Sequence, residues 1–227
     1  EASDPSHAGS GFAGGRLVDQ ATLRRPLVRL PIDDRPVGPD PMSTFFSRYF
    51  ENSTLLVAAA SEGDFEDLVG LLRRVGERRG KVLLAGNGGS AAIVGHVTVD
   101  RVKAAGLRAV NFNESSLITC FANDYGFDRW VAEALRAHAD PEDLVVLISS
   151  SGESDDIVNA AMEAEKMGLD LVVLSGFSSD NRLRSYGQIS FWVDSTSYNH
   201  VENTHQVWLL AALDRFIASS KSDVVED

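Results

Sequence analysis

The sequence contains a single cysteine and no long run of apolar residues. With only Cys120 available, an intrachain disulfide and a zinc site built from several cysteines are both excluded. No apolar run approaches the roughly 20 residues that a membrane-spanning helix requires. The N-terminus also lacks the basic-then-apolar pattern of a secretory signal. These absences predict a cytoplasmic protein that does not associate with membranes.

Positive charge is scarce as well. The 21 Lys and Arg residues are outnumbered by 33 Asp and Glu residues, which gives a formal net charge of −12. Such an excess of negative charge argues against a nucleic-acid-binding surface. An anionic substrate would therefore have to be held by local hydrogen-bond donors or by a bound cation.

What is present is ordinary globular composition, 44% hydrophobic and 24% charged over 227 residues, which suits one α/β domain with a tail. Nearly all-apolar runs alternate with segments of helical pattern, so we expect a parallel sheet covered by helices on both faces. The expected strands are 82–85, 107–112, 144–148, 169–174 and 189–193. The expected helices are 44–60, 64–79, 91–103, 113–124, 128–138, 155–167 and 200–218.

The two ends of the chain differ from this pattern. Residues 1–41 are rich in Gly, Ser, Pro and Asp without periodicity, which predicts a flexible tail or linker. The chain does not begin with Met, and such a linker is compatible with a fusion partner before it. We expect one domain over 42–220, followed by an acidic C-terminal tail over 221–227.

A glycine-rich segment, Gly86-Asn87-Gly88-Gly89-Ser90, follows the first expected strand and opens a helix. Backbone N–H groups and a helix N-terminus can approach an anion closely there. The segment lacks G-x-G-x-x-G, because position 91 is Ala, and it lacks the Lys of a P-loop. A plain tight turn is therefore the alternative. The helix then carries His96 and Asp100 four residues apart, hence on one face.

A serine-rich segment, 149–154, follows the third expected strand. Ser149, Ser151 and Ser154 offer hydroxyl donors beside the N-terminus of a helix, a combination that suits phosphate without Lys or Arg. Ser154 alone has an alternative interpretation as a helix N-cap. Ligands of parallel sheets bind at the carboxyl ends of the strands, where both segments lie. Three neighbouring acids would oppose a phosphate: Glu153, Asp155 and Asp156.

Taken in order, these segments resemble the sugar isomerase (SIS) domain and, within it, the phosphoheptose isomerases. The resemblance covers about Thr44 to Ala218. It rests on 86–90 with His96 following, on 120–127 (Cys-Phe-Ala-Asn-Asp-Tyr-Gly-Phe), and on 148–154 (Ile-Ser-Ser-Ser-Gly-Glu-Ser). It implies a three-layer, flavodoxin-like five-stranded parallel sheet and a homotetramer with sites at subunit interfaces. The implied reaction converts sedoheptulose 7-phosphate to an aldose 7-phosphate.

The resemblance also assigns site residues. The serine segment would bind the phosphate of the sugar, and the sugar itself would contact Asn87, Gly88, Ser90 and Asp124. The catalytic half departs from the family pattern. The family's His and Glu are here His96 and Asp100, and its later Gln and His align with Glu202 and Leu210. In the family this His completes a zinc site and supplies an acid/base group, whereas Leu210 can neither bind zinc nor move a proton.

Two hypotheses for the altered half remain open. Asp100 and Glu202 can divide the acid/base work of an enediol-type proton transfer, or they can hold zinc together with His96. His205 is the candidate replacement for the missing histidine, with a hydrogen-bonded helix histidine as the alternative. For His200 we favour the interpretation as a surface or hydrogen-bonded helix histidine.

A ketose–aldose isomerase acting on a long-chain sugar phosphate is the predicted function, with sedoheptulose 7-phosphate or an eight-carbon homologue as substrate. The alternative is a non-catalytic binding module, since some SIS proteins without the zinc residues serve as regulatory or assembly proteins. Losing the last histidine fits that alternative. Gaining the Glu202 carboxylate favours the enzyme.

Overall fold

The computed structural model describes residues 42–222. The tail predicted at 1–41 lies outside the described residues. Of the tail predicted at 221–227, residues 221 and 222 belong to the last helix, and the rest lies outside. No helix in the described part of the chain is long and apolar enough to cross a membrane.

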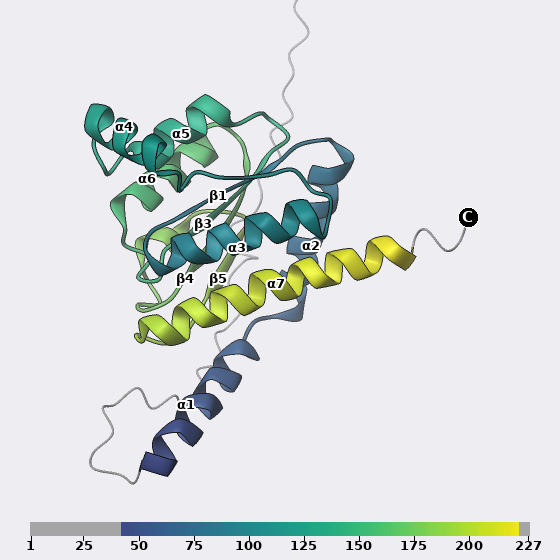
Figure 1. Ribbon diagram of the computed structural model, residues 1–227, viewed down its shortest axis with the longest axis vertical. Helices are drawn as coiled ribbons and strands as arrows, with labels where there is room; N and C mark the ends of the chain where they lie inside the picture. The colour runs from purple at the N-terminus through teal and green to yellow at the C-terminus, as the bar shows by residue number, and fades with distance from the viewer. Residues whose placement is uncertain (1–41, 223–227) are drawn as a thin grey trace, which may run out of the picture.

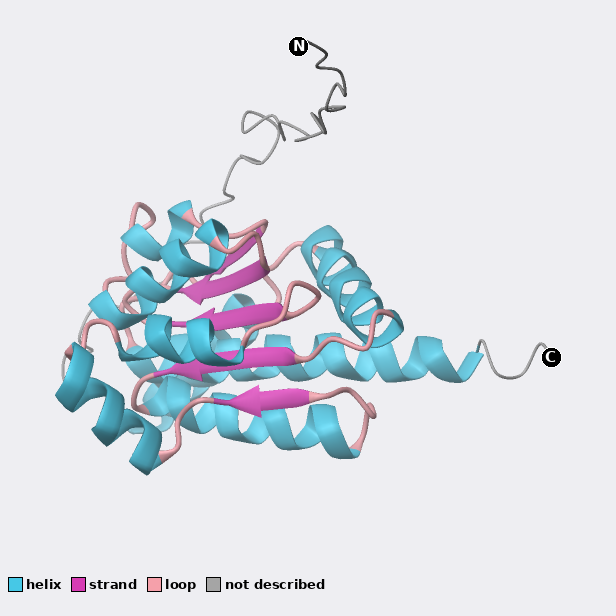
Figure 2. Cartoon of the chain, turned by 90° about the horizontal axis from the view of Figure 1, so that it is seen from above, coloured by secondary structure: helices cyan, strands magenta, loops and turns pink. Residues whose placement is uncertain are grey.

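Five parallel strands form one sheet in the order β2-β1-β3-β4-β5. Their bounds are β1 Val82–Gly86, β2 Ala109–Asn111, β3 Leu144–Ile148, β4 Asp170–Ser175 and β5 Ile189–Trp192. The strand arrows all point the same way, with helices on both sides (Figure 2). Because β1 and β3 are buried on both faces, they read as unbroken apolar runs. The predicted flavodoxin-like α/β fold is confirmed.

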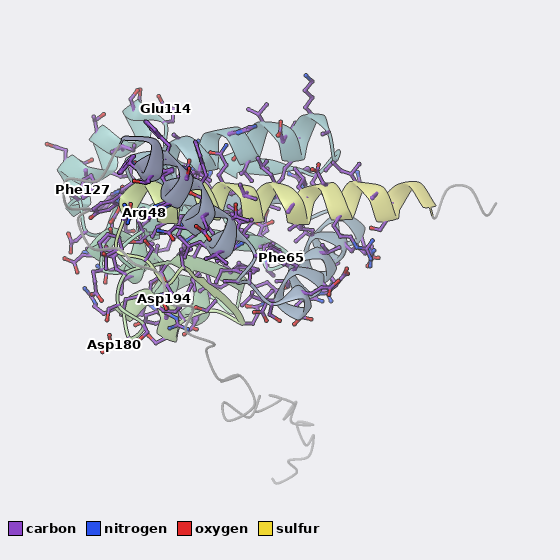
Figure 3. The ribbon with its side chains drawn as sticks, turned by 90° about the horizontal axis from the view of Figure 1, so that it is seen from below. Arg48, Phe65, Glu114, Phe127, Asp180 and Asp194 are labelled. Atoms are coloured by element: carbon purple, nitrogen blue, oxygen red, sulfur yellow. The ribbon has the colours of Figure 1, made fainter. Side chains whose placement is uncertain are left out.

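The helices are α1 Met42–Val57, α2 Glu62–Glu77, α3 Gly89–Lys103, α4 Ser115–Tyr125, α5 Trp130–His138, α6 Asp155–Lys166 and α7 Tyr198–Ser222. Apolar residues of α2, α3 and α7 share one core cluster with one face of the sheet, and those of α5 and α6 share another with the opposite face. Phe65 of α2, labelled in Figure 3, contacts the rings of Phe191 in β5 and Trp208 in α7. The result is a three-layer domain.

Two elements differ from the sequence prediction. The strand expected over 107–112 is only Ala109–Asn111, because β2 pairs with β1 alone at the edge of the sheet and is only half buried. A short 3₁₀ helix, η2 Arg182–Ser185, was not predicted. Its Asn181 side chain caps it by accepting a hydrogen bond from the Arg184 N–H.

The register of the sheet brings the two predicted loops together. Gly86, the last residue of β1, lies opposite Ile148, the last residue of β3. Since the strands are parallel neighbours, the glycine segment after β1 and the serine segment after β3 emerge side by side. The fold therefore makes one site at this edge from two segments about 60 residues apart in sequence.

Arg101 is an anomaly of the core. It lies near the end of α3, is fully buried, and within residues 42–222 none of its three guanidinium nitrogens has a hydrogen-bond partner. Burial lowers the pKa of Arg101 to about 10, which still leaves the side chain charged at neutral pH. A buried charge without a partner destabilises the folded state.

We expect Arg101→Met to raise the free energy of unfolding by about 1–4 kcal/mol, because it replaces an unpaired buried cation by an apolar chain of similar length. Urea denaturation at pH 7 would measure the change. Lys103→Met, at an exposed position of the same helix, is the control and should change stability by less than about 0.5 kcal/mol. Destabilisation by Arg101→Met would contradict this expectation.

Candidate active site

The glycine segment turns β1 into α3 and receives a carboxylate from α7. Gly88 has φ 54°, a left-handed conformation that favours glycine. A Cβ on Gly89 would meet the carboxylate of Glu202, so a larger residue there would have to displace this side chain. Glu202 thus occupies the N-terminal end of α3, where the helix dipole favours a negative charge.

Glu202 also reaches the serine segment. The Ser150 hydroxyl donates to Oε1 of Glu202 at 3.2 Å, and the Ser150 and Ser90 hydroxyl oxygens are 3.4 Å apart. Ser90 and Ser150 are buried, whereas Glu202 is half-buried. The structure therefore places one partly accessible carboxylate between the two loops.

The three predicted phosphate-binding serines lie around the start of α6. The Ser149 hydroxyl donates to the Ser154 hydroxyl at 3.1 Å, and Oγ of Ser151 accepts from the Glu153 N–H at 3.2 Å. Ser154 occupies the N-cap position, but its side chain makes no capping hydrogen bond. The capping interpretation therefore does not account for this hydroxyl. It accepts from Ser149, and its own proton remains available for a ligand beside the helix N-terminus.

The acids that would oppose a phosphate are engaged elsewhere. Arg182 of η2 holds Oδ1 of Asp155 at 2.7 Å, and its backbone N–H donates to Oε1 of Glu153 at 3.0 Å. Asp156 turns inward and accepts hydrogen bonds from Asn87 and Trp130. Burial raises the pKa of the Asp156 carboxyl, while those two donors act in the opposite direction. The local negative charge is thus partly neutralised and directed away from the serines.

His96 and Asp100 come together as predicted from their spacing, with Nε2 of His96 3.2 Å from Oδ2 of Asp100. The other ring nitrogen lies 3.2 Å from Nε2 of Gln206 on α7. Glu202 does not join this pair, because it sits at Gly89, which is about 10 Å from His96 along the axis of α3.

The predicted zinc set is therefore not assembled. Among the described residues, no three His, Cys, Asp or Glu side chains lie close enough to hold a metal ion. His96, Asp100 and Glu202 do not converge within one chain, and we derive no step through a metal.

His205 does not face the loops. It is fully buried, and Nε2 lies 3.0 Å from the Ser175 carbonyl oxygen at the end of β4. Burial lowers the pKa of His205 to about 4, so the imidazole is neutral at physiological pH. Its position on the buried side of α7 does not favour the acid/base role expected for it.

The remaining candidates lie apart from the two loops. His200 is buried against Tyr49 of α1, with ring centroids 4.3 Å apart, so it is not a surface histidine. Its Nδ1 lies 3.1 Å from the Ser53 hydroxyl, which agrees with a hydrogen-bonded helix histidine. Asp124 is exposed on α4, and its carboxylate accepts hydrogen bonds from Asn123 and Cys120 of the same helix. Leu210 packs against the core.

Sequence reasoning missed three side chains of this site. Ser150, which donates to Glu202, was not among the predicted site residues. Its position directly after β3, between Ser149 and Ser151, was the available signal. Asp156 and Arg182 were missed because their partners lie far away in sequence. The three acids next to the proposed phosphate site were the signal in the sequence that a basic side chain, here Arg182, had to neutralise them.

A family model described as SIS domain matches residues 46–176, more than half of the chain. The chain belongs to the SIS domain family. A phosphoheptose isomerase of Mycobacterium tuberculosis is 33% identical over 174 residues, spanning 73% of this chain and 84% of the relative. The predicted membership among the phosphoheptose isomerases, a class of sugar-phosphate isomerases, is confirmed.

Solved structures agree with this placement. A phosphoheptose isomerase from Francisella tularensis superimposes with a TM-score of 0.72 at 26% identity, covering 79% of this chain and all of that one. One from Neisseria gonorrhoeae gives a TM-score of 0.70 at 23% identity and covers 77% of this chain and 98% of that one. At that lower identity the likeness concerns the fold alone.

Proposed function

We propose that this SIS protein interconverts a ketose and an aldose of a long-chain sugar phosphate, with sedoheptulose 7-phosphate or an eight-carbon homologue as substrate. The observation that carries the proposal is the Ser150–Glu202 hydrogen bond. It holds a carboxylate next to the serines that suit a phosphate, at the shared edge of β1 and β3. A base beside a phosphate site is what isomerisation of a sugar phosphate requires.

In the proposed mechanism, the serine segment and the N-terminus of α6 bind the phosphate, while the glycine segment holds the sugar. The Glu202 carboxylate takes a proton from the carbon next to the ketose carbonyl and returns it to the former carbonyl carbon. The proton of the hydroxyl group moves to the carbonyl oxygen through the enediol, so no atom is gained or lost. Ser90, whose hydroxyl oxygen lies 3.4 Å from that of Ser150, is the hydroxyl left to donate a hydrogen bond to oxygen as its charge develops, because Ser150 already donates to Glu202.

The test is a coupled assay of seven- and eight-carbon ketose phosphates, run with and without a chelator. We expect conversion of at least one of them. Binding without any conversion, with zinc or without, would instead support the non-catalytic binding module. Activity abolished by the chelator and restored by zinc would show that chains together supply ligands that one chain does not assemble.

We further propose that the protein is a homotetramer in which α1 is covered by other copies. This helix extends away from the sheet (Figure 1). Its C-terminal end packs on α7, where the Trp208 indole N–H donates to the Val57 carbonyl. It exposes three phenylalanines, Phe45, Phe46 and Phe50, which are 46%, 56% and 62% exposed. Aromatic side chains gathered on one helix are characteristic of subunit interfaces.

Light scattering at micromolar concentration should therefore give a multiple of the 24.5 kDa chain mass. Replacing Phe46 and Phe50 together by Glu should lower that mass, because charge cannot be buried in an apolar interface. Met162→Glu, at an exposed position of α6 on the opposite face of the sheet, is the control and should leave it unchanged. A wild-type monomer would contradict the proposal.

A further inference from the structure

Asp156 is a buried acid that the proposed proton transfer does not use. It lies in the first turn of α6 and is only 2% exposed. Nδ2 of Asn87 lies 2.9 and 2.8 Å from its two carboxylate oxygens, and Nε1 of the buried Trp130 lies 3.1 Å from one of them. The carboxylate thereby joins the glycine segment, α5 and α6 at the floor of the site.

This contact determines which way the Asn87 amide points. A carboxylate only accepts hydrogen bonds, so the side chain must turn its NH₂ group towards Asp156. Its carbonyl oxygen, Oδ1, consequently faces the other way. Within residues 42–222, no donor lies within hydrogen-bond distance of that oxygen. Asn87 is only half-buried, so a ligand can reach it. An acceptor is left free on the ligand side of the glycine segment.

We propose that Asp156 is a positioning residue that makes Asn87 an obligatory acceptor, selecting a sugar hydroxyl and rejecting a phosphate oxygen at the glycine segment. The inference rests on the proposed function for the identity of the ligand. A hydroxyl can donate to Oδ1, whereas a phosphate oxygen would meet another acceptor there. The nearby Glu202 carboxylate adds a second acceptor and a negative charge.

The two loops then differ in chemistry and set the direction of the ligand. The serine segment supplies donors at the start of α6, and its exposed acids are held by Arg182. The glycine segment supplies acceptors from Asn87 and Glu202. A sugar phosphate can satisfy both only with its phosphate at the serines and its hydroxyls at the glycines. Asp156 maintains this difference between the two loops by fixing the Asn87 amide. It lies in the first turn of α6, the helix whose N-terminus is proposed to bind the phosphate.

The test is a double-mutant cycle with binding as the readout, measured by calorimetry on the full chain. Asp156→Asn keeps the shape but gives the side chain an NH₂ group, so Asn87 is free to reverse its amide. We expect about tenfold weaker binding of sedoheptulose 7-phosphate and unchanged binding of inorganic phosphate. In an Asn87→Ala background, Asp156→Asn should add no further loss.

Asp155→Asn is the matched control, with the same change one residue earlier on an exposed side chain, and it should leave Asn87 fixed. Equal losses for the sugar phosphate and inorganic phosphate, or a loss that persists in the Asn87→Ala background, would reduce Asp156 to a structural role and overturn the inference. So would wild-type protein that binds no sugar phosphate. Protein that binds the sugar phosphate without isomerising it would contradict only the proposed function.

A second measurement does not depend on the variant folding. In the wild-type protein, the side-chain NH₂ protons of Asn87 should exchange slowly with solvent in nuclear magnetic resonance spectra, because a buried carboxylate holds them. They should stay protected when the sugar phosphate binds. Fast exchange, or protection that appears only with ligand, would mean that the ligand and not Asp156 orients the amide.

Discussion

Glu202→Gln is expected to lower turnover by roughly 10²–10⁴-fold, the range typical of a lost general acid or base. Glutamine keeps the length of the side chain, and its carbonyl oxygen can still accept from the Ser150 hydroxyl 3.2 Å away. The amide cannot take a proton at neutral pH. Substrate affinity should therefore change only a few-fold while kcat falls, which steady-state kinetics in the coupled assay would separate.

Asp214→Asn is the control for this substitution. It makes the same chemical change on the same helix, at an exposed residue three turns further along α7. Its kcat and KM should equal those of the wild type. If Glu202→Gln retains more than about a third of the wild-type kcat, Glu202 does not transfer the proton, and its role is limited to occupying the N-terminus of α3 at Gly89.

The fold, and the edge of the sheet where the candidate site is placed, followed from local sequence. The buried strands β1 and β3 are unbroken apolar runs, and each ends in a Gly- or Ser-rich loop. Since the carboxyl ends of parallel strands form one edge, placing both loops there required no knowledge of side-chain contacts. The register between Gly86 and Ile148 then brings the loops side by side.

The directions of side chains on α7 did not follow so directly. His205 lies three residues after Glu202 and Gln206 lies four after it, so a helical wheel puts both near its face, rotated about 60° to one side and about 40° to the other. Only packing against the sheet decides between them. Gln206 meets His96 on α3, whereas His205 turns inward to the Ser175 carbonyl. The expected catalytic histidine was misplaced for this reason.

The acids near the serines show the same limit. Their number argued against a phosphate, because local sequence does not reveal distant partners. Arg182 lies 27 residues beyond Asp155 and Asn87 lies 69 residues before Asp156, yet these pairs decide where the charges point. The carboxylates of Asp155 and Asp156 hydrogen-bond to these partners and not to the serine hydroxyls. The acids therefore oppose phosphate binding less than their number suggests.

The serine segment itself should therefore bind the phosphate, and Ser149→Ala combined with Ser151→Ala should weaken binding of both the sugar phosphate and inorganic phosphate by about 100-fold or more. Each hydrogen bond to a charged group contributes about 1.5–3 kcal/mol, and two are removed. Calorimetry would measure the affinities. Thermal unfolding should shift little, because the double variant loses only two hydrogen bonds within the fold, the one from Ser149 to Ser154 and the one that Ser151 accepts from the Glu153 N–H.

The matched control removes two hydroxyls at the far end of α7, one on a buried and one on an exposed serine. Ser219 and Ser220 both donate to the Phe216 carbonyl, and replacing both by Ala should leave phosphate affinity unchanged. An unchanged affinity in the Ser149/Ser151 variant would move the phosphate elsewhere. The N-terminus of α3 could not then receive it without displacing Glu202, whose carboxylate already lies against Gly89. The assignment of the phosphate to the serine segment therefore depends on the hydroxyls of Ser149 and Ser151.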